Sequence, residues 1–206
     1  MSFFKKKELF YVLSFLSFAL ILSLGFSSQA QAATVKGFNF KPGDILITKS
    51  TSSDGIAGHS AIVDQTGANM IHIAGYGHTP ARHSVEWFLN NYKATKVVRY
   101  KSSASAQKAG TYAYNNYYKG AYKTHPYGLT PNPKDRTKLY CSEIVWQSYY
   151  YGAGVTFYGL ATKPVKKVIP SYIMPYDYIG KYESMNGYST VKSFNWWEIK
   201  KRDYIQ

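Results

Sequence analysis

The stretch GHSAIVDQTGANMIHIA, residues 58–74, decides the fold that the sequence predicts. It holds two short β-rich runs, 59–63 and 70–74, on either side of a polar, glycine-containing turn at 64–69. Two such runs joined by a short turn are typical of a β-hairpin. A third β-rich run, ILIT at 45–48, precedes them. These runs indicate a sheet that forms early in the chain.

Helical and strand patterns alternate through the rest of the chain. Ser84 is a candidate N-cap for a short helix over 85–91. Apolar residues at helical spacing predict two further helices, one over 105–118 that Gly120 stops and one over about 141–151 that Gly152 ends. Strands are expected at 96–100 and 189–194. The sequence therefore predicts an α+β domain in which an antiparallel sheet packs against helices.

The first 32 residues have the pattern of a secretory signal peptide. Three lysines at 5–7 precede an apolar run from Leu9 to Phe26, and the segment ends on the small-x-small triplet AQA at 30–32. We expect cleavage after Ala32. The alternative is a retained membrane anchor, because the apolar run approaches the roughly 20 residues of a spanning helix. With cleavage, no membrane span is expected, and residues 33–206 form a single domain.

The composition is strongly basic, with 25 lysines and arginines against 11 acidic residues and a formal net charge of +14. Such a charge favours association with polyanions. In an exported protein the expected partners are anionic wall polymers or lipid head groups, and nucleic acid is not expected. We therefore expect the protein to be extracellular or associated with the cell wall.

Cys141 is the only cysteine in the chain, so no internal disulfide can form. A lone cysteine in an exported protein is an intermolecular bridge, a buried apolar residue or a reactive thiol. The run LYCSEIV at 139–145 places Cys141 at the start of a predicted helix, after a proline-rich loop. The helix dipole and a nearby imidazolium both favour the thiolate at such a position. This context predicts a nucleophile, and His59, beside Gly58, is the best candidate for its base.

Four segments carry a resemblance to a known family: GDIL at 43–46, GHSAIV at 58–63, MIHIA at 70–74 and YCSEIV at 140–145. In their order and spacing they resemble the circularly permuted branch of the NlpC-type papain-like cysteine peptidases, in which the cysteine helix follows the histidine strand. The resemblance covers roughly residues 41–178. It implies a permuted papain-like fold for the domain, with Cys141 as nucleophile and His59 as general base.

The same resemblance implies the other members of the site. His72 falls on the third, polar position and would hold the His59 imidazole in its productive tautomer. Asp64 and Glu143 remain open as alternatives for this role. Tyr140 could add a hydroxyl to the substrate pocket, with core packing as an equal alternative. His125 lies in a loop that resembles the segment lining the family's cleft, which implies contact with substrate.

We therefore expect an exported cysteine hydrolase that cleaves an amide bond, in cell-wall peptides, through a thioacyl intermediate at Cys141. One alternative is an acyltransferase or esterase acting on lipid-like substrates. Another is a non-catalytic module that binds the cell wall. No cofactor is expected, and no metal, because the spacing of His72, His78 and His83 fits no zinc pattern.

Overall fold

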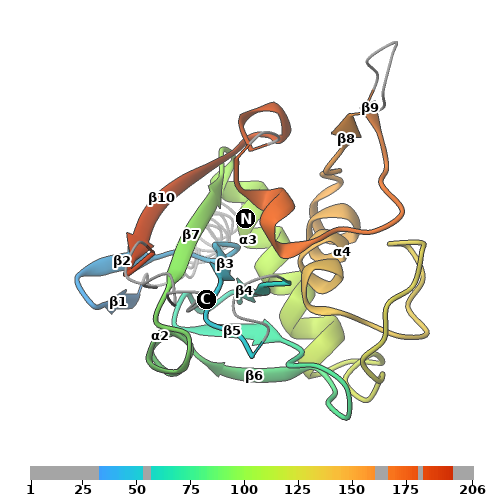
Figure 1. Cartoon of the computed structure of the whole chain (residues 1–206), viewed down its shortest axis with the longest axis horizontal. Coiled ribbons are helices and arrows are strands. Elements are labelled where there is room, and N and C mark those ends of the chain that lie inside the picture. The colour runs from blue at the N-terminus through green and yellow to red at the C-terminus, as the bar shows by residue number, and fades with distance from the viewer. Residues whose placement is uncertain (1–32, 53–56, 161–166, 181–182, 197–206) are drawn as a thin grey trace, which may run out of the picture.

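An antiparallel sheet of six strands forms the centre of the protein (Figure 1). The computed structural model describes residues 33–52, 57–160, 167–180 and 183–196. Across the sheet the order is β10 (Tyr188–Phe194), β7 (Thr95–Tyr100), β3 (Ile45–Thr48), β4 (His59–Val63), β5 (Asn69–His72) and β6 (Ala81–Ser84). The predicted α+β class and antiparallel sheet are confirmed.

Helices cover the sheet from two sides. Helix α3 (Ser103–Ala113) continues into the π-helical turn η1 (Tyr114–Tyr118), and it packs against α4 (Cys141–Ala153) on one face. The other face is covered by α2 (Val85–Asn91) and by the hairpin of β1 (Ala33–Val35) and β2 (Phe38–Phe40). Two hydrophobic cores result, one on each side of the sheet.

The remaining elements are short. They are the two-residue strands β8 (Gly159–Leu160) and β9 (Lys167–Val168) and the 3₁₀ turns η2 (Pro175–Tyr178) and η3 (Ser184–Asn186). A long irregular segment, 119–140, connects η1 to α4 and is closed by a bridge between Tyr127 and Leu139. This bridge brings the segment back to the start of α4.

Alternation along β4 assigns its side chains to the two cores. Ile62 packs in the core beneath α4, whereas Ala61 and Val63 pack in the core beneath α2. Because successive side chains of a strand point to opposite faces, Ser60 lies on the α4 side and His59 on the α2 side. The side chains of His59 and Ser60, although adjacent in β4, thus lie on opposite faces of the sheet.

Helix α4 begins at Cys141, as predicted, because the preceding residue leaves the helical conformation. Tyr140 has extended backbone angles, and its N–H donates to the Glu143 carboxylate at 3.3 Å, which caps the first turn. The predicted end at Gly152 is wrong. The helix ends at Gly154, which takes the left-handed conformation with φ of 65°. Gly152 instead permits close packing of α4, since a Cβ there would lie 2.6 Å from the Cβ of Tyr112.

Some elements differ from the sequence-based expectation. Strand β6 and the hairpin β1–β2 were not predicted, and the helix expected over 105–118 starts two residues earlier and becomes π-helical at Tyr114. The β6 sequence, ARHS, has no apolar alternation, and its side chains are only partly buried. Its strand conformation comes from pairing with β5 at the edge of the sheet.

The predicted signal peptide, residues 1–32, lies outside the described residues and stays a prediction. Within the part of the chain that the structure describes, no helix is both long and apolar enough to span a membrane.

Candidate active site

Cys141 is the first residue of α4, and its side chain is almost fully buried, with 6% of its surface exposed. Burial raises the pKa of the thiol, while contacts with Ser60 and Ser142 oppose this shift. The resting thiol is therefore protonated more strongly than the helix start alone would predict. To act as a nucleophile, such a thiol would need a base.

Ser60 has an unusual position beside this thiol. Its hydroxyl is completely buried on the α4 side of β4, and it makes no hydrogen bond of standard geometry with any described residue. It lies close enough to Cys141 to influence the thiol. A buried hydroxyl without a hydrogen-bond partner costs free energy, so the unpaired Ser60 hydroxyl beside Cys141 calls for an explanation.

His59 and His72 form a buried pair on the other side of the sheet. Nε2 of His59 lies 2.9 Å from Nδ1 of His72, and the exposed fractions of the two side chains are 5% and 2%. Burial lowers the pKa of His59 to about 4. Burial and the neighbouring His59 lower the pKa of His72 to about 3. Both rings are therefore neutral at pH 7.

The pair forms through the register of β4 and β5. Ile62 pairs with Ile71, which places His72 opposite Ala61 if the ladder is continued. His59 lies two residues from Ala61 on the same face, so the two histidines are diagonal neighbours across the hairpin. Diagonal neighbours are within reach of long side chains.

Aromatic side chains of α2 enclose the pair. The ring centroid of His59 lies 5.9 Å from that of Phe88 and 5.3 Å from that of Tyr92. His72 lies 5.7 Å from Trp87 and 5.4 Å from His83 by the same measure. These rings exclude water and explain why burial dominates both pKa shifts.

The thiol and the histidine pair share neighbours at the start of β4, because Ser60, which lies beside the thiol, directly follows His59 in the strand. Among the described residues no hydrogen bond joins the Cys141 sulfur to either imidazole. Tyr92 lies near both groups, because its ring contacts His59 while burial and the nearby Cys141 raise the pKa of its phenol. Gly58, which directly precedes β4, has a φ of 65° and allows the ring of Tyr176 to pack closely. A Cβ at this position would lie 2.7 Å from that ring.

The two residues expected to bind substrate are occupied by internal contacts. The Tyr140 hydroxyl accepts a hydrogen bond from the Ile173 N–H at 3.1 Å, and the side chain is buried. His125 contacts the Arg136 carbonyl through Nδ1, and its ring lies 5.1 Å from that of Tyr122. No contact of His125 with Cys141 or the histidine pair appears among the described residues. Its substrate role stays a prediction.

The alternative third residues are engaged elsewhere. Asp64 accepts from Arg82 Nε at 2.6 Å and from the Thr66 N–H at 2.8 Å, so it closes the β4–β5 turn. Glu143 caps α4 and also accepts from the Thr130 hydroxyl at 3.3 Å. Of the three candidates, only His72 has a hydrogen-bond contact with His59 among the described residues.

Sequence reasoning missed Ser60, Tyr92 and Tyr127 as neighbours of the thiol. Burial, followed by the effects of Cys141 and Tyr76, raises the pKa of Tyr127 to about 12. Ser60 could have been found from its place next to His59 in the strand. The tyrosines could not, because 21 tyrosines in the chain give no local signal that separates two of them.

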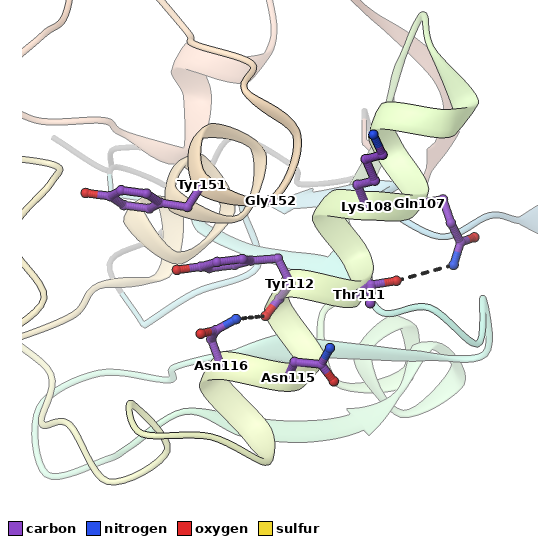
Figure 2. Close-up of a pocket in the computed structure, with 8 residues that line it drawn as sticks. All are labelled: Gln107, Lys108, Thr111, Tyr112, Asn115, Asn116, Tyr151 and Gly152. Atoms are coloured by element: carbon purple, nitrogen blue, oxygen red, sulfur yellow. Dashed lines mark hydrogen bonds between the residues drawn. The ribbon is translucent and has the colours of Figure 1, made fainter.

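A metal centre is not suggested by the residues that the structure describes, where no group of three or more His, Cys, Asp or Glu side chains could hold an ion. A cavity of about 340 Å³ lies elsewhere, between α3 and the end of α4, and Figure 2 shows the residues that line it. It is lined by Gln107, Lys108, Thr111, Tyr112, Asn115, Asn116, Tyr151 and Gly152. Gly152 lies about 16 Å along the helix from Cys141, so this cavity is separate from the candidate site.

Comparison with known proteins identifies a related family. The sequence model of the family described as "Lipoprotein N-acylation protein LnsA-like" matches residues 4–189. An uncharacterized 30.3 kDa protein of Bacillus thuringiensis is 32% identical over 170 residues, which are 77% of this chain and 59% of that protein. The chain thus spans less than two thirds of this relative.

A solved structure also resembles the fold. It is that of the metalloprotein yiiX from Escherichia coli O157:H7, with a TM-score of 0.48 and 18% identity over 63% of this chain and 76% of the other.

The family match overturns one expectation. The assignment to NlpC-type cysteine peptidases is wrong, and with it the interpretation of the chain as a thiol protease. A papain-like fold is not confirmed.

Proposed function

The chain belongs to the LnsA-like lipoprotein N-acylation family, and from this premise we propose that it is an acyltransferase that carries an acyl group on Cys141. The family match includes Cys141, His59 and His72. The observation that carries the proposal is the buried contact of 2.9 Å between His72 of β5 and His59 of β4, the strand that presents Ser60 to the thiol. Of the activities considered from the sequence, acyl transfer from lipid-like substrates fits this family best.

The proton positions follow from the histidine contact. If the Nε2–H of His59 donates to Nδ1 of His72, then Nδ1 of His59 is unprotonated and can accept the proton of the thiol. The opposite tautomer would block this nitrogen. His72 therefore acts as a positioning residue that selects the reactive tautomer and stabilises the imidazolium once it forms.

The first half-reaction forms a thioester. His59 takes the thiol proton, the Cys141 sulfur attacks the carbonyl carbon of a lipid acyl ester, and the ester bond breaks. The proton on His59 passes to the departing alkoxide, which leaves as an alcohol. N–H groups in the first turn of α4 have no partner within the helix and can stabilise the oxyanion of the intermediate.

The second half-reaction transfers the acyl group to an amine. The family's description names lipoprotein N-acylation, and we infer that the acceptor is an amino group of a lipoprotein. The amine attacks the thioester carbonyl, an amide bond forms, and Cys141 leaves as a thiol after His59 moves the proton. Water would be the competing acceptor, with a free fatty acid as product.

The missing hydrogen bond between Cys141 and His59 is compatible with this route. Catalytic hydrogen bonds are often long in unliganded enzymes and shorten when substrate binds. The His59 ring is neutral at pH 7, because burial holds its pKa at about 4, so its unprotonated nitrogen can accept a proton although the buried ring is a weak base. The raised pKa of the thiol means that the nucleophile is formed during the reaction and is not stored as a thiolate.

The test uses the full chain and a p-nitrophenyl ester of a medium-chain fatty acid. We expect a burst of p-nitrophenolate equal to the amount of enzyme, together with an acyl adduct on Cys141 that mass spectrometry detects and neutral hydroxylamine removes. Cys141→Ala should form no adduct. Ser148→Ala is a matched control, because it removes a buried hydroxyl of α4 that bonds to the Ile144 carbonyl.

The acceptor is tested by adding a peptide with a free N-terminal amine and the same peptide with that amine acetylated. Transfer to the free amine alone supports N-acylation. An adduct that persists in Cys141→Ala would overturn the proposal, as would its absence in the wild-type protein. If the enzyme released only free fatty acid and the added amine did not change the products, the proposal that the acceptor is an amine would be overturned.

A further inference from the structure

The four most exposed large apolar side chains of the described residues all lie on segments that border Cys141. They are Tyr76, Leu129, Tyr172 and Met174, with exposed fractions of 77%, 51%, 44% and 40%. Single exposed apolar residues are common on protein surfaces. Their concentration around one buried thiol is not, and exposed apolar clusters mark interaction sites. We call these four side chains the apolar rim.

One side of the rim is fastened to both neighbours of Cys141. The N–H of Ile173 donates to the Tyr140 hydroxyl at 3.1 Å, and the carbonyl of Ile173 accepts from the Ser142 hydroxyl. Ile173 itself is fully buried. Tyr172 and Met174 flank it and lie in solvent, so both are held at the edge of the site by a rigid anchor.

The other side of the rim is held by the segment that precedes Cys141. The N–H of Gly128 donates to the Leu139 carbonyl at 3.0 Å, which places Leu129 next to the residues that lead into α4. Tyr127 lies near the thiol, and its ring centroid is 5.1 Å from that of Tyr76. Its N–H also donates to the His78 carbonyl at 3.1 Å, which ties the loop carrying Tyr76 to the site.

Basic side chains accompany the rim. Lys123 and Lys138 are exposed on the same irregular segment as Leu129, and Lys138 contacts Gly128. The whole chain has a formal net charge of +14. Exposed aromatic and aliphatic side chains next to lysines are typical of surfaces that enter the interface of an anionic membrane. Tyrosine suits this interface because its ring is apolar and its hydroxyl polar.

We propose that the apolar rim docks the entrance of the Cys141 site on an anionic lipid membrane. This inference deepens the proposed function and rests on it, since a lipid acyl ester would then reach the thiol from the bilayer without crossing water. Tyr76, Leu129, Tyr172 and Met174 would enter the interface, and the lysines would lie at the level of the anionic head groups.

The test places one fluorescent label at a time on the full chain. Cys141→Ser removes the only natural thiol, and Tyr76→Cys, Leu129→Cys or Tyr172→Cys then introduces a single site for an environment-sensitive dye. Vesicles of phosphatidylcholine with phosphatidylglycerol as the minor component are added. Rim labels should shift to shorter wavelength and brighten severalfold. Added salt and vesicles of phosphatidylcholine alone should weaken the response.

Two control positions lie away from the rim. Val191→Cys is on β10, the strand at the far edge of the sheet, and Lys108→Cys is on α3, where this helix packs beside Gly152 near the opposite end of α4 from Cys141. Their labels should keep the emission of an aqueous environment. Because each label reports its own surroundings, the comparison does not depend on how the full chain attaches to the vesicle.

The outcomes separate docking from catalysis, because the Cys141→Ser background has no nucleophile and turnover is not measured. Rim labels that stay aqueous would overturn the inference, including the case in which the rim binds another protein. Equal shifts at rim and control positions would also overturn it. Either result leaves the thioester experiment unaffected, and a failed thioester experiment leaves the label shifts interpretable.

Discussion

The strongest quantitative prediction concerns the buried pair of His59 and His72 at acid pH. Both folded-state pKa values, about 4 and about 3, lie below the ordinary value of 6.5. Each buried neutral ring therefore contributes to the free energy of unfolding above pH 6.5, and this contribution is lost as the pH falls toward the folded-state pKa. At pH 5 the unfolded chain binds a proton at each position, and the folded chain does not.

The size of the stability loss follows from the difference between the ordinary histidine pKa of 6.5 and the assay at pH 5. Each pH unit costs about 1.4 kcal/mol for a group that is protonated only in the unfolded state, so each histidine contributes a loss of about 2 kcal/mol. His72→Asn removes one titrating ring and retains an oxygen that can accept from His59. Between pH 8 and pH 5 this variant should therefore lose about 2 kcal/mol less stability than the wild-type protein.

The assay is urea unfolding followed by tryptophan fluorescence at several pH values, with the m-value used to check that the unfolding reaction stays the same. Ser148→Ala is the control, because it removes a buried hydrogen bond of 2.6 Å and should lower stability equally at every pH. Glu143 titrates with the opposite sign in all three proteins and cancels in the differences. An identical loss of stability in His72→Asn and the wild type would refute the reasoning.

Three further predictions concern single residues. Ser60→Ala should slow alkylation of Cys141 by iodoacetamide at pH 7 about fivefold, because the nearby hydroxyl opposes the rise in the pKa of the thiol by about 1 kcal/mol, and an unchanged rate would show that the hydroxyl is inert. Burial raises the pKa of Glu143 to about 8 from 4.5, so its stabilisation is present below pH 4.5 and lost as the pH rises. The wild type should lose about 2 kcal/mol between pH 6 and pH 8 on this account, and Glu143→Gln should abolish that loss in urea titrations. Gly152→Ala should destabilise by about 1–3 kcal/mol, despite the better helix propensity of alanine, because its Cβ would collide with Tyr112; calorimetry showing a raised Tm would contradict the packing.

Local signals were sufficient wherever one segment determines its own structure. Ser84 caps α2 by accepting from the Trp87 N–H, as its position before an apolar stripe predicted. The strand at 59–63 and the start of α4 at Cys141 were also predicted, since alternation and the preceding loop mark them. The contact between His59 and His72 could be anticipated only in part, because it depends on the register of two strands.

Contacts between segments that are far apart in the sequence could not be predicted from local sequence patterns. Strand β6 forms because β5 offers it an edge, and the ring of Tyr92 reaches the site because α2 ends there. His125 was assigned to the cleft from its loop, but its ring contacts the Arg136 carbonyl and Tyr122. The family assignment failed for a related reason. Short motifs around a cysteine and a histidine describe a type of site, and a match over residues 4–189 is needed to identify the family.

The placement of the site on two distant segments has a consequence for how the protein matures. β3, β4 and β5 follow one another closely in the chain and pair by local hairpins, which form quickly. α4 lies far downstream and can pack on β4 only after a long loop closes, which is slow. During synthesis the two histidines can therefore meet before the cysteine has emerged from the ribosome. Cys141 reaches the sheet last, so under the proposed function an unfinished chain cannot yet accept an acyl group.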